Sequence, residues 1–284
     1  MDVDRGEAET GDVVASVSDV AVEDDRGVRA VDGVSFDVRG GEVFGIAGVD
    51  GNGQSELVEA VTGLQSADAG EVRFRGDDVT TASRRDRIDA GMAYVPEDRQ
   101  ERGLVMEFDL VENGLLGSQH DPDFAANGRV DWPKTRDHAE AIIGEYDVRP
   151  PDAGADAESL SGGNQQKFIV GREFERDPEL VVASHPTRGV DVGSIEFIHE
   201  RLLELRRQGV AILLVSSKLE EVQGLSDRLA VIYEGEFIDV VDRDETTEEE
   251  LGLLMAGERP GGDAGESDRD EPVDSADTAG GGRA

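Results

Sequence analysis

Alternation of apolar and polar positions predicts the first strands of the chain. The alternating stretches, typical of strands with one buried face, are residues 13–22, 34–38 and 71–75. A second pattern consists of short runs that are almost wholly apolar, and it predicts strands in the middle of a parallel sheet covered on both faces. These runs are residues 43–47, 91–95, 180–184 and 210–216.

Helical spacing of apolar positions follows several of these strands. Helices are predicted at residues 55–62, 195–207, 218–225 and 248–256. A mixed helical pattern covers residues 105–148, and two last strands are predicted at 229–233 and 236–241. Strands that alternate with helices in this way predict an α/β fold. The hairpin-like spacing of the first strands predicts an antiparallel sheet beside the parallel one.

The composition narrows the functions open to such a fold. The 284 residues include 28 basic and 65 acidic side chains and no cysteine, for a formal charge of −37. The lack of cysteine excludes disulfides and thiolate metal sites. No apolar run approaches the roughly 20 residues of a membrane helix, and the sequence shows no signal peptide. The negative charge argues against nucleic-acid binding, which needs a basic surface.

Most of the negative charge lies on the part of the chain that is expected to fold. The loop-like leader 1–12 and tail 257–284, both predicted to be disordered, carry −4 and −5, which leaves −28 on residues 13–256. The apolar runs in 13–256 exclude acidic disorder there. We interpret the charge as adaptation to molar salt, where the Debye length falls to about 3 Å and self-repulsion is screened.

A glycine-rich turn follows the strand predicted at 43–47. The run GVDGNGQS matches the phosphate-loop template of Gly, four residues, Gly, Lys and Ser or Thr, except that glutamine replaces the lysine. Glycines let backbone N–H groups converge on phosphate oxygens, and the next helix adds about half a positive charge at its N-terminus. An ordinary glycine-rich turn is the alternative. The candidate phosphate-binding residues are Gly48, Asp50, Gly51, Asn52, Gly53, Gln54, Ser55 and Glu56.

A second loop that leads into a helix has the sequence LSGGNQQK, at residues 160–167. Ser161 is the expected N-cap, and Gly162 and Gly163 allow close approach of another backbone or a phosphate. A capped helix without further function is the alternative. The order along the chain is more informative: phosphate loop, this segment, a buried strand, and then PTRGVD at 186–191.

This order and spacing resemble the nucleotide-binding domain of ATP-binding-cassette (ABC) proteins over residues 13–256. The resemblance implies a P-loop NTPase fold with a RecA-like parallel sheet, an antiparallel β subdomain and a helical subdomain at about 105–175. The runs GVDGNGQSEL, YVPEDR, LSGGNQQK, PTRGVDVGSIEFIH and LSDRLAVIYEG look like the second, C-terminal cassette of nucleoside and monosaccharide importers, with a lean toward the nucleoside branch. Such importers usually fuse two cassettes, whereas this length holds one. We therefore expect either a split gene or a fragment of a longer protein.

Five positions that carry catalytic groups in the resembled family hold other residues here. Ser184 and His185 stand at the positions of the magnesium-binding aspartate and the catalytic glutamate. Ser217 replaces the switch histidine, Glu97 replaces the glutamine that senses magnesium, and Gln54 replaces the lysine. A polar contact at a strand end is the alternative role of His185. Phosphoryl transfer depends on positioning and charge stabilisation, so we expect impaired hydrolysis and weak nucleotide binding at the chain's own loop.

The positions that serve a facing cassette keep the pattern of the resembled family. The resemblance therefore implies that this chain completes the ATP site of a partner, which is either a cassette with intact catalytic motifs or a second copy of the chain. ATP and Mg²⁺ are the expected cofactors, with Ser55 as the expected metal ligand. The partner-facing residues are Ser161, Gly162, Gly163, Asn164, Gln165 and Asp191.

The resemblance also implies membrane partners. These are permease subunits and, indirectly, an extracellular substrate-binding lipoprotein, with the chain peripheral at the cytoplasmic face of the cell membrane. Permease docking is expected on residues 97–116, where Leu104, Val105, Met106 and Phe108 form an apolar groove unless they belong to the core. Two other functions remain as alternatives: a self-sufficient ATPase subunit of a sugar importer, and a soluble ABC protein outside transport.

Overall fold

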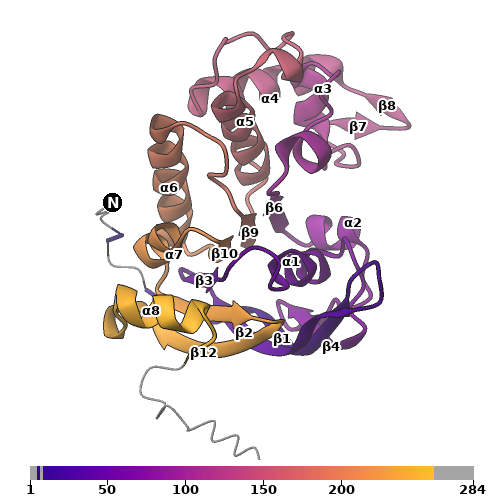
Figure 1. Ribbon diagram of the computed structural model, residues 1–284. Helices are drawn as coiled ribbons and strands as arrows, with labels where there is room; N and C mark the ends of the chain where they lie inside the picture. The colour runs from indigo at the N-terminus through magenta and orange to yellow at the C-terminus, as the bar shows by residue number, and fades with distance from the viewer. Residues whose placement is uncertain (1–4, 7–8, 259–284) are drawn as a thin grey trace, which may run out of the picture.

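An antiparallel sheet forms one end of the molecule. The computed structural model describes residues 5–6 and 9–258 (Figure 1). The strand order in this sheet is β2-β1-β4-β5. A bulge beside Gly33, which has φ 67°, interrupts the alternation in β2, so the alternating pattern predicted only the stretch 34–38 of this longer strand. The strands are β1 (Val13–Glu23), β2 (Arg29–Arg39), β4 (Ala69–Phe74) and β5 (Asp77–Asp78).

A six-stranded sheet forms the middle of the molecule, with the order β12-β11-β3-β10-β9-β6. Its strands are parallel except for β12, which pairs antiparallel with β11 at the edge. Every residue of β3 and β9 is buried, and both strands coincide with the apolar runs that predicted them. The strands are β3 (Val43–Ala47), β6 (Met92–Val95), β9 (Leu180–Ser184), β10 (Ala211–Ser216), β11 (Arg228–Tyr233) and β12 (Glu236–Asp242).

Helices α3, α4 and α5 gather at the end of the molecule that lies opposite the antiparallel sheet (Figure 1). The mixed pattern at 105–148 contains α3 and α4, separated by a short hairpin of β7 (Ala125–Ala126) and β8 (Arg129–Val130). The α-helices are α1 (Gln54–Thr62), α2 (Arg84–Asp89), α3 (Leu110–Leu115), α4 (Trp132–Glu145), α5 (Gly162–Phe174), α6 (Val192–Arg207), α7 (Leu219–Leu225) and α8 (Glu248–Met255). A π-helical turn covers Arg99–Gly103, and 3-10 turns cover Ala157–Ser159 and Arg243–Glu245.

Apolar side chains cover both faces of the parallel sheet. On one face, α1 packs between the two sheets, and the rings of Phe36 on β2 and Phe44 on β3 stack with centroids 5.1 Å apart. On the other face, Phe168 of α5 and Ile198 of α6 belong to a second buried cluster. This covering confirms the predicted α/β fold with its parallel and antiparallel sheets.

The described part of the predicted leader contacts the body of the protein. Arg5 donates to the carbonyl oxygen of Ser226 and pairs with Asp244 at 3.0 Å, while Arg206 donates to the carbonyl oxygen of Arg5 at 3.0 Å. The predicted tail lies outside the described residues except for 257–258. Within the residues that the structure describes, the helices are too short or too polar for a membrane span.

Arg87 of α2 is a fully buried arginine that ties α2 to the helix of the phosphate loop. Its side chain is 1% exposed, and its guanidinium donates to the carbonyl oxygens of Ala60 and Val61 at the end of α1. Further donations go to the carbonyl oxygens of Val79 and Thr80. Because five planar donors serve several carbonyl groups at once, this side chain fixes the C-terminal end of α1.

We expect Arg87→Leu to lower the free energy of unfolding by about 3 kcal/mol, since buried carbonyl groups lose their donors. Urea unfolding of the two proteins in molar salt measures the difference. Arg85→Leu is the matched control, because Arg85 is exposed on the same helix and forms an exposed ion pair with Asp89 at 3.5 Å. Its expected change is within about 0.5 kcal/mol. Equal losses in the two variants would contradict this account of Arg87.

Candidate functional site

The carboxyl ends of the parallel strands bring the predicted catalytic positions to one edge of the sheet. Ala47 of β3 pairs with Ser216 of β10, and Ser184 of β9 pairs with Val215 of β10. The phosphate loop (residues 48–55), the segment after β9 and the segment after β10 therefore start side by side. Glu97 follows β6, which pairs with β9, so it reaches the same edge. Ligand sites of parallel α/β sheets lie at such an edge.

Glycines allow the phosphate loop to pack against its surroundings. Gly51 and Gly53 have φ 92° and 98°, a backbone conformation that favours glycine. A Cβ atom added at Gly53 would lie 2.1 Å from the carbonyl oxygen of Ala30. Asn52 ties the loop to the turn between β11 and β12, since its side-chain oxygen accepts from the backbone N–H of Glu234 at 2.9 Å. The loop is therefore held from two sides.

The side chain of Gln54 turns back into the phosphate loop. It is 3% exposed, its Nε2 donates to the carbonyl oxygen of Val49 at 3.0 Å, and its Oε1 accepts from the backbone N–H of Asn52 at 3.1 Å. Ser55 and Asp50 are exposed, and Glu56 is half-buried. The loop thus presents glycine backbone and the start of α1, without a cation at the lysine position.

His185 stands at the end of β9 in a left-handed conformation, with φ 44°. Burial lowers the pKa of His185, so the imidazole is neutral at neutral pH. Its Nδ1 accepts from the backbone N–H of Ser217 at 3.4 Å, which places the proton of the neutral ring on Nε2. Nε2 is then a donor and not a base. Ser184, 3% exposed, offers a hydroxyl at the position of the expected carboxylate.

The residues at this edge do not fit a magnesium site of the chain's own. Mg²⁺ is held in proteins mainly by carboxylate oxygens and water. Ser55 supplies one hydroxyl, and the carboxylate of Glu97 is paired with Arg188. In residues 5–6 and 9–258, no group of three or more histidine, aspartate or glutamate side chains is arranged to hold a metal ion.

A buried polar network braces the two segments that follow β9 and β10. The carboxylate of Glu221 accepts from Thr187 at 2.6 Å, from His199 at 2.8 Å and from Ser216 at 2.6 Å. Burial favours a raised pKa for Glu221, but these three hydrogen bonds outweigh it and hold the pKa below its usual value. Lys218 donates to the carbonyl oxygen of Thr187 at 3.2 Å. Sequence reasoning missed this network because its members are spread over four elements.

The loop LSGGN leads into α5 as predicted, and Ser161 is its N-cap residue, although the serine does not cap the helix through its side chain. Its side chain makes no capping hydrogen bond, since its Oγ accepts from the Nδ2 of Asn164 at 2.8 Å. Asn164 in turn accepts from the backbone N–H of Arg149 at 2.8 Å. Ser161 itself is exposed. The side chains of the loop are therefore ordered by one another, and the hydroxyl of Ser161 remains at the surface.

The start of α5 packs directly against the start of α6. A Cβ atom added at Gly163 would lie 2.5 Å from both the Oδ2 of Asp191 and the Oγ of Ser194. Asp191 caps α6 by accepting from the backbone N–H of Ser194 at 3.0 Å. Hydrogen bonds from Ser194 lower the pKa of Asp191. A side chain at position 163 would have to displace Asp191 or Ser194, so the glycine allows this close approach of the two segments that were predicted to face a partner.

Arg99 connects three of the segments at this edge. Its Nη1 donates to the carbonyl oxygen of Arg188 at 2.9 Å, and its Nε donates to the Oε1 of Gln165 at 3.3 Å. Gln165 is 3% exposed, and its side chain donates to the carbonyl oxygen of Ala157 at 3.0 Å. This side chain is therefore buried within the protein and is not at the surface. A Cβ atom added at Gly162 would lie 2.7 Å from Nη2 of Arg99. The run YVPEDR contains this arginine, but sequence reasoning gave it no role.

The apolar groove predicted around residues 104–108 is only partly at the surface. Leu104 is 5% exposed and belongs to the core beside α5, so the expectation that it lines an open groove is wrong. Val105 and Met106 are half-buried, while Phe108 is 38% exposed. A neighbouring cleft of about 560 Å³ is lined by Val111 and by Trp132, which is 50% exposed, among other residues. The exposed apolar surface therefore includes the start of α4.

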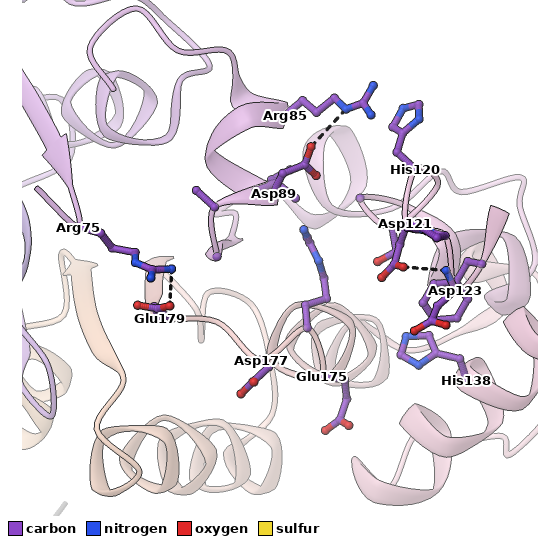
Figure 2. Close-up of a pocket in the computed structure, with 18 residues that line it drawn as sticks. Arg75, Arg85, Asp89, His120, Asp121, Asp123, His138, Glu175, Asp177 and Glu179 are labelled. Atoms are coloured by element: carbon purple, nitrogen blue, oxygen red, sulfur yellow. Dashed lines mark hydrogen bonds and ion pairs between the residues drawn. The ribbon is translucent and has the colours of Figure 1, made fainter. Parts of the chain in front are cut away.

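A larger cleft, of about 800 Å³, lies near the amino ends of β6 and β9, away from the carboxyl ends that carry the predicted catalytic positions. Figure 2 shows the ion pairs of Arg85 with Asp89 and of Arg75 with Glu179 on its walls, with Asp121 on the segment between α3 and α4. These charged groups are solvated or paired with one another. The cleft shares no lining residue with the phosphate loop or with the loop LSGGN.

We expect Arg99→Ala to raise the hydrogen-exchange rates of the backbone amides at 161–165 and 188–191 by about fivefold, because each lost hydrogen bond is worth about 1 kcal/mol. Exchange followed by mass spectrometry measures both segments in one experiment. Arg201→Ala is the control, since Arg201 pairs with Glu145 and Glu204 outside these segments. A change in only one of the two segments would show that Arg99 does not connect them.

Known proteins provide an independent comparison with this geometry. The family model of ABC transporters matches residues 31–188. Among solved structures, a nucleotide-free ATP-binding cassette from an ABC transporter superposes with a TM-score of 0.69 at 24% identity, covering 86% of this chain and 96% of that one. A dimeric bacterial ABC transporter cassette gives a TM-score of 0.70 at 21% identity, covering 81% and 98%. These likenesses confirm the ABC cassette fold.

Curated relatives are similar over most of the chain. The guanosine import ATP-binding protein NupO of Bacillus subtilis is 48% identical over 250 residues, which cover 88% of this chain and 49% of the relative. The glucose import ATP-binding protein TsgD13 of Haloferax volcanii is 44% identical over 264 residues, which cover 92% and 48%. The chain thus spans about half the length of the curated relatives it matches.

Proposed function

The chain belongs to the ATP-binding proteins of ABC transporters, and we propose that it is the degenerate second cassette of an importer for nucleosides or simple sugars. One contrast within the site carries this proposal. The chain's own phosphate loop faces strand ends that hold Ser184 and His185 in place of carboxylates, whereas Ser161, Gly163 and Asp191 keep a tightly packed partner-facing surface.

The chain's own loop lacks the groups that phosphoryl transfer needs. A cation at position 54, a metal carboxylate at position 184 and a base at position 185 are all replaced. Each such loss commonly costs about 10²-fold or more in rate, although losses within one site do not simply add. Hydrolysis at this loop is therefore negligible, while the glycine backbone and the start of α1 retain weak nucleotide affinity.

The partner-facing surface has a complementary role. In a facing arrangement, the exposed hydroxyl of Ser161 and the backbone N–H groups at the start of α5 point at a nucleotide held by the partner. The partner brings its own lysine, glutamate and Mg²⁺. This chain then contributes binding and orientation, and the reaction takes place on the partner's groups.

The class of transported substrate follows from the similar proteins. Two of them are import proteins for guanosine and for nucleosides, and another is an import protein for glucose. We infer a nucleoside or simple sugar for the complex, with a lean toward nucleosides. The assembly then includes permease subunits and an extracellular binding lipoprotein, and the chain lies at the cytoplasmic face of the membrane. The charge of −37 indicates a cytoplasm of molar salt.

An ATPase assay in molar potassium chloride tests the central proposal. We expect no turnover by this chain alone, and turnover when it is mixed with a cassette that carries the lysine and glutamate it lacks. Ser161→Arg is expected to lower the kcat of the mixture at least about 100-fold, because a bulky cation replaces the hydroxyl that faces the nucleotide.

Ser66→Arg is the control for this assay, since Ser66 is exposed beyond the end of α1. It is expected to leave the kcat of the mixture unchanged. Magnesium-dependent turnover by the chain alone would favour the self-sufficient ATPase instead. An unchanged kcat of the Ser161→Arg mixture would contradict the role of the loop LSGGN.

The exposed apolar residues near α4 are the proposed permease contact. Trp132 and Phe108 are exposed beside the cleft at the start of α4. We expect Trp132→Glu to reduce the fraction of the chain that sediments with membranes containing its permease about tenfold, since an apolar contact is replaced by a charge. The melting temperature should stay unchanged because Trp132 is half exposed. Equal sedimentation of the two proteins would place the contact elsewhere.

A further inference from the structure

Gln54 occupies the phosphate loop with polar atoms of the chain itself. The loop is built to offer backbone N–H groups to an anion, but the N–H of Asn52 is already donated to the Oε1 of Gln54 at 3.1 Å. The same N–H lies 3.3 Å from the carbonyl oxygen of Val49, so it is shared between two acceptors inside the loop. We propose that Gln54 is an internal ligand of the loop, which phosphate must displace before it binds.

The packing of Gln54 supports this role. The side chain is 3% exposed, although it belongs to the first residue of α1 at the surface edge of the sheet. Its Nε2 donates to the carbonyl oxygen of Val49 at 3.0 Å, and a Cβ atom added at Gly48 would lie 2.5 Å from that nitrogen. The amide therefore bridges both sides of the loop and lies against its first glycine.

A lysine at this position cannot act in the same way. An ammonium group has three donors and no acceptor, so it does not compete for the N–H of Asn52, whose remaining acceptor in the loop is the carbonyl oxygen of Val49 at 3.3 Å. A carboxamide has both kinds of group, and it satisfies a loop donor and a loop acceptor at once. The replacement of lysine thus does more than remove a charge, because it adds a competitor for the N–H group.

This competition determines whether a mutation of Gln54 strengthens or weakens phosphate binding. If Gln54 helps to hold phosphate, its removal weakens binding. If it competes, its removal leaves the N–H of Asn52 with only the longer contact to the carbonyl oxygen of Val49, and binding of phosphate becomes tighter. One neutral hydrogen bond is worth about 1 kcal/mol, so we expect Gln54→Ala to tighten binding of pyrophosphate on the order of fivefold.

Calorimetric titration of the folded chain with sodium pyrophosphate, in molar potassium chloride, measures this change. Pyrophosphate is the probe because it isolates the loop from any contact with adenine. The variants are Gln54→Ala and Gln54→Met, of which the second keeps the length of the side chain and removes its oxygen. Gln65→Ala is the matched control, since Gln65 lies beyond the other end of α1 and donates to the carbonyl oxygen of Glu23 at 2.7 Å.

Tighter binding by both Gln54 variants, with the control equal to the unmodified chain, supports the proposal. Weaker or unchanged binding by the two variants overturns it, and so does a failure of all the proteins to bind pyrophosphate. Circular dichroism identifies a variant that fails to fold, and the other then decides. The inference rests on the proposed function only in taking this loop as the chain's own nucleotide site. The ATPase assay with Ser161→Arg tests the surface around the loop LSGGN. A negative result in the pyrophosphate titration therefore does not contradict the proposal for that loop, and a negative ATPase result does not contradict the proposal for Gln54.

Discussion

The parallel pairing of β10 between β3 and β9 is the constraint on which the site depends. The register of Ala47 with Ser216 and of Ser184 with Val215 fixes where three loops start. A slip of one residue would move every side chain of a strand to the other face of the sheet. The backbone therefore decides which positions meet, and the side chains at the strand ends decide what chemistry is available there.

Much of the fold was predictable because it follows from apolar patterns that are local in the sequence. The wholly buried strands β3 and β9 coincide with their apolar runs, whereas β2 differs from its prediction because of the bulge beside Gly33. The order of the motifs predicted the ABC cassette fold, which the solved structures confirm. Contacts between residues that are distant in the sequence could not be predicted in this way. No local pattern indicated that Arg99 joins segments 188–189 and 165.

The candidate site shows the same limit at the level of single side chains. The sequence predicted which positions are replaced, and the roles of these residues stay predictions. It did not predict that the hydroxyl of Ser161 would accept a hydrogen bond from Asn164 and make none to the start of α5. It also did not predict that the side chain of Gln54 would point back toward the phosphate loop. Both outcomes depend on which of several nearby acceptors a polar side chain reaches, and this is decided by packing.

The neutral residues at positions 54 and 184 suit one another within the proposed degenerate site. A lysine buried at position 54 would need an anionic partner, because a buried charge without one costs several kcal/mol, and the side chains of Ser184 and His185 do not supply it. Replacing both partners by neutral groups avoids this cost, and Gln54 satisfies its own polar atoms within the loop. The surface that we propose to face a partner instead relies on glycine contacts and backbone hydrogen bonds, as at Gly163 and Asp191. Molar salt screens long-range charge interactions but leaves such short contacts intact, so we expect the packing of Gly163 against Asp191 to persist at high salt.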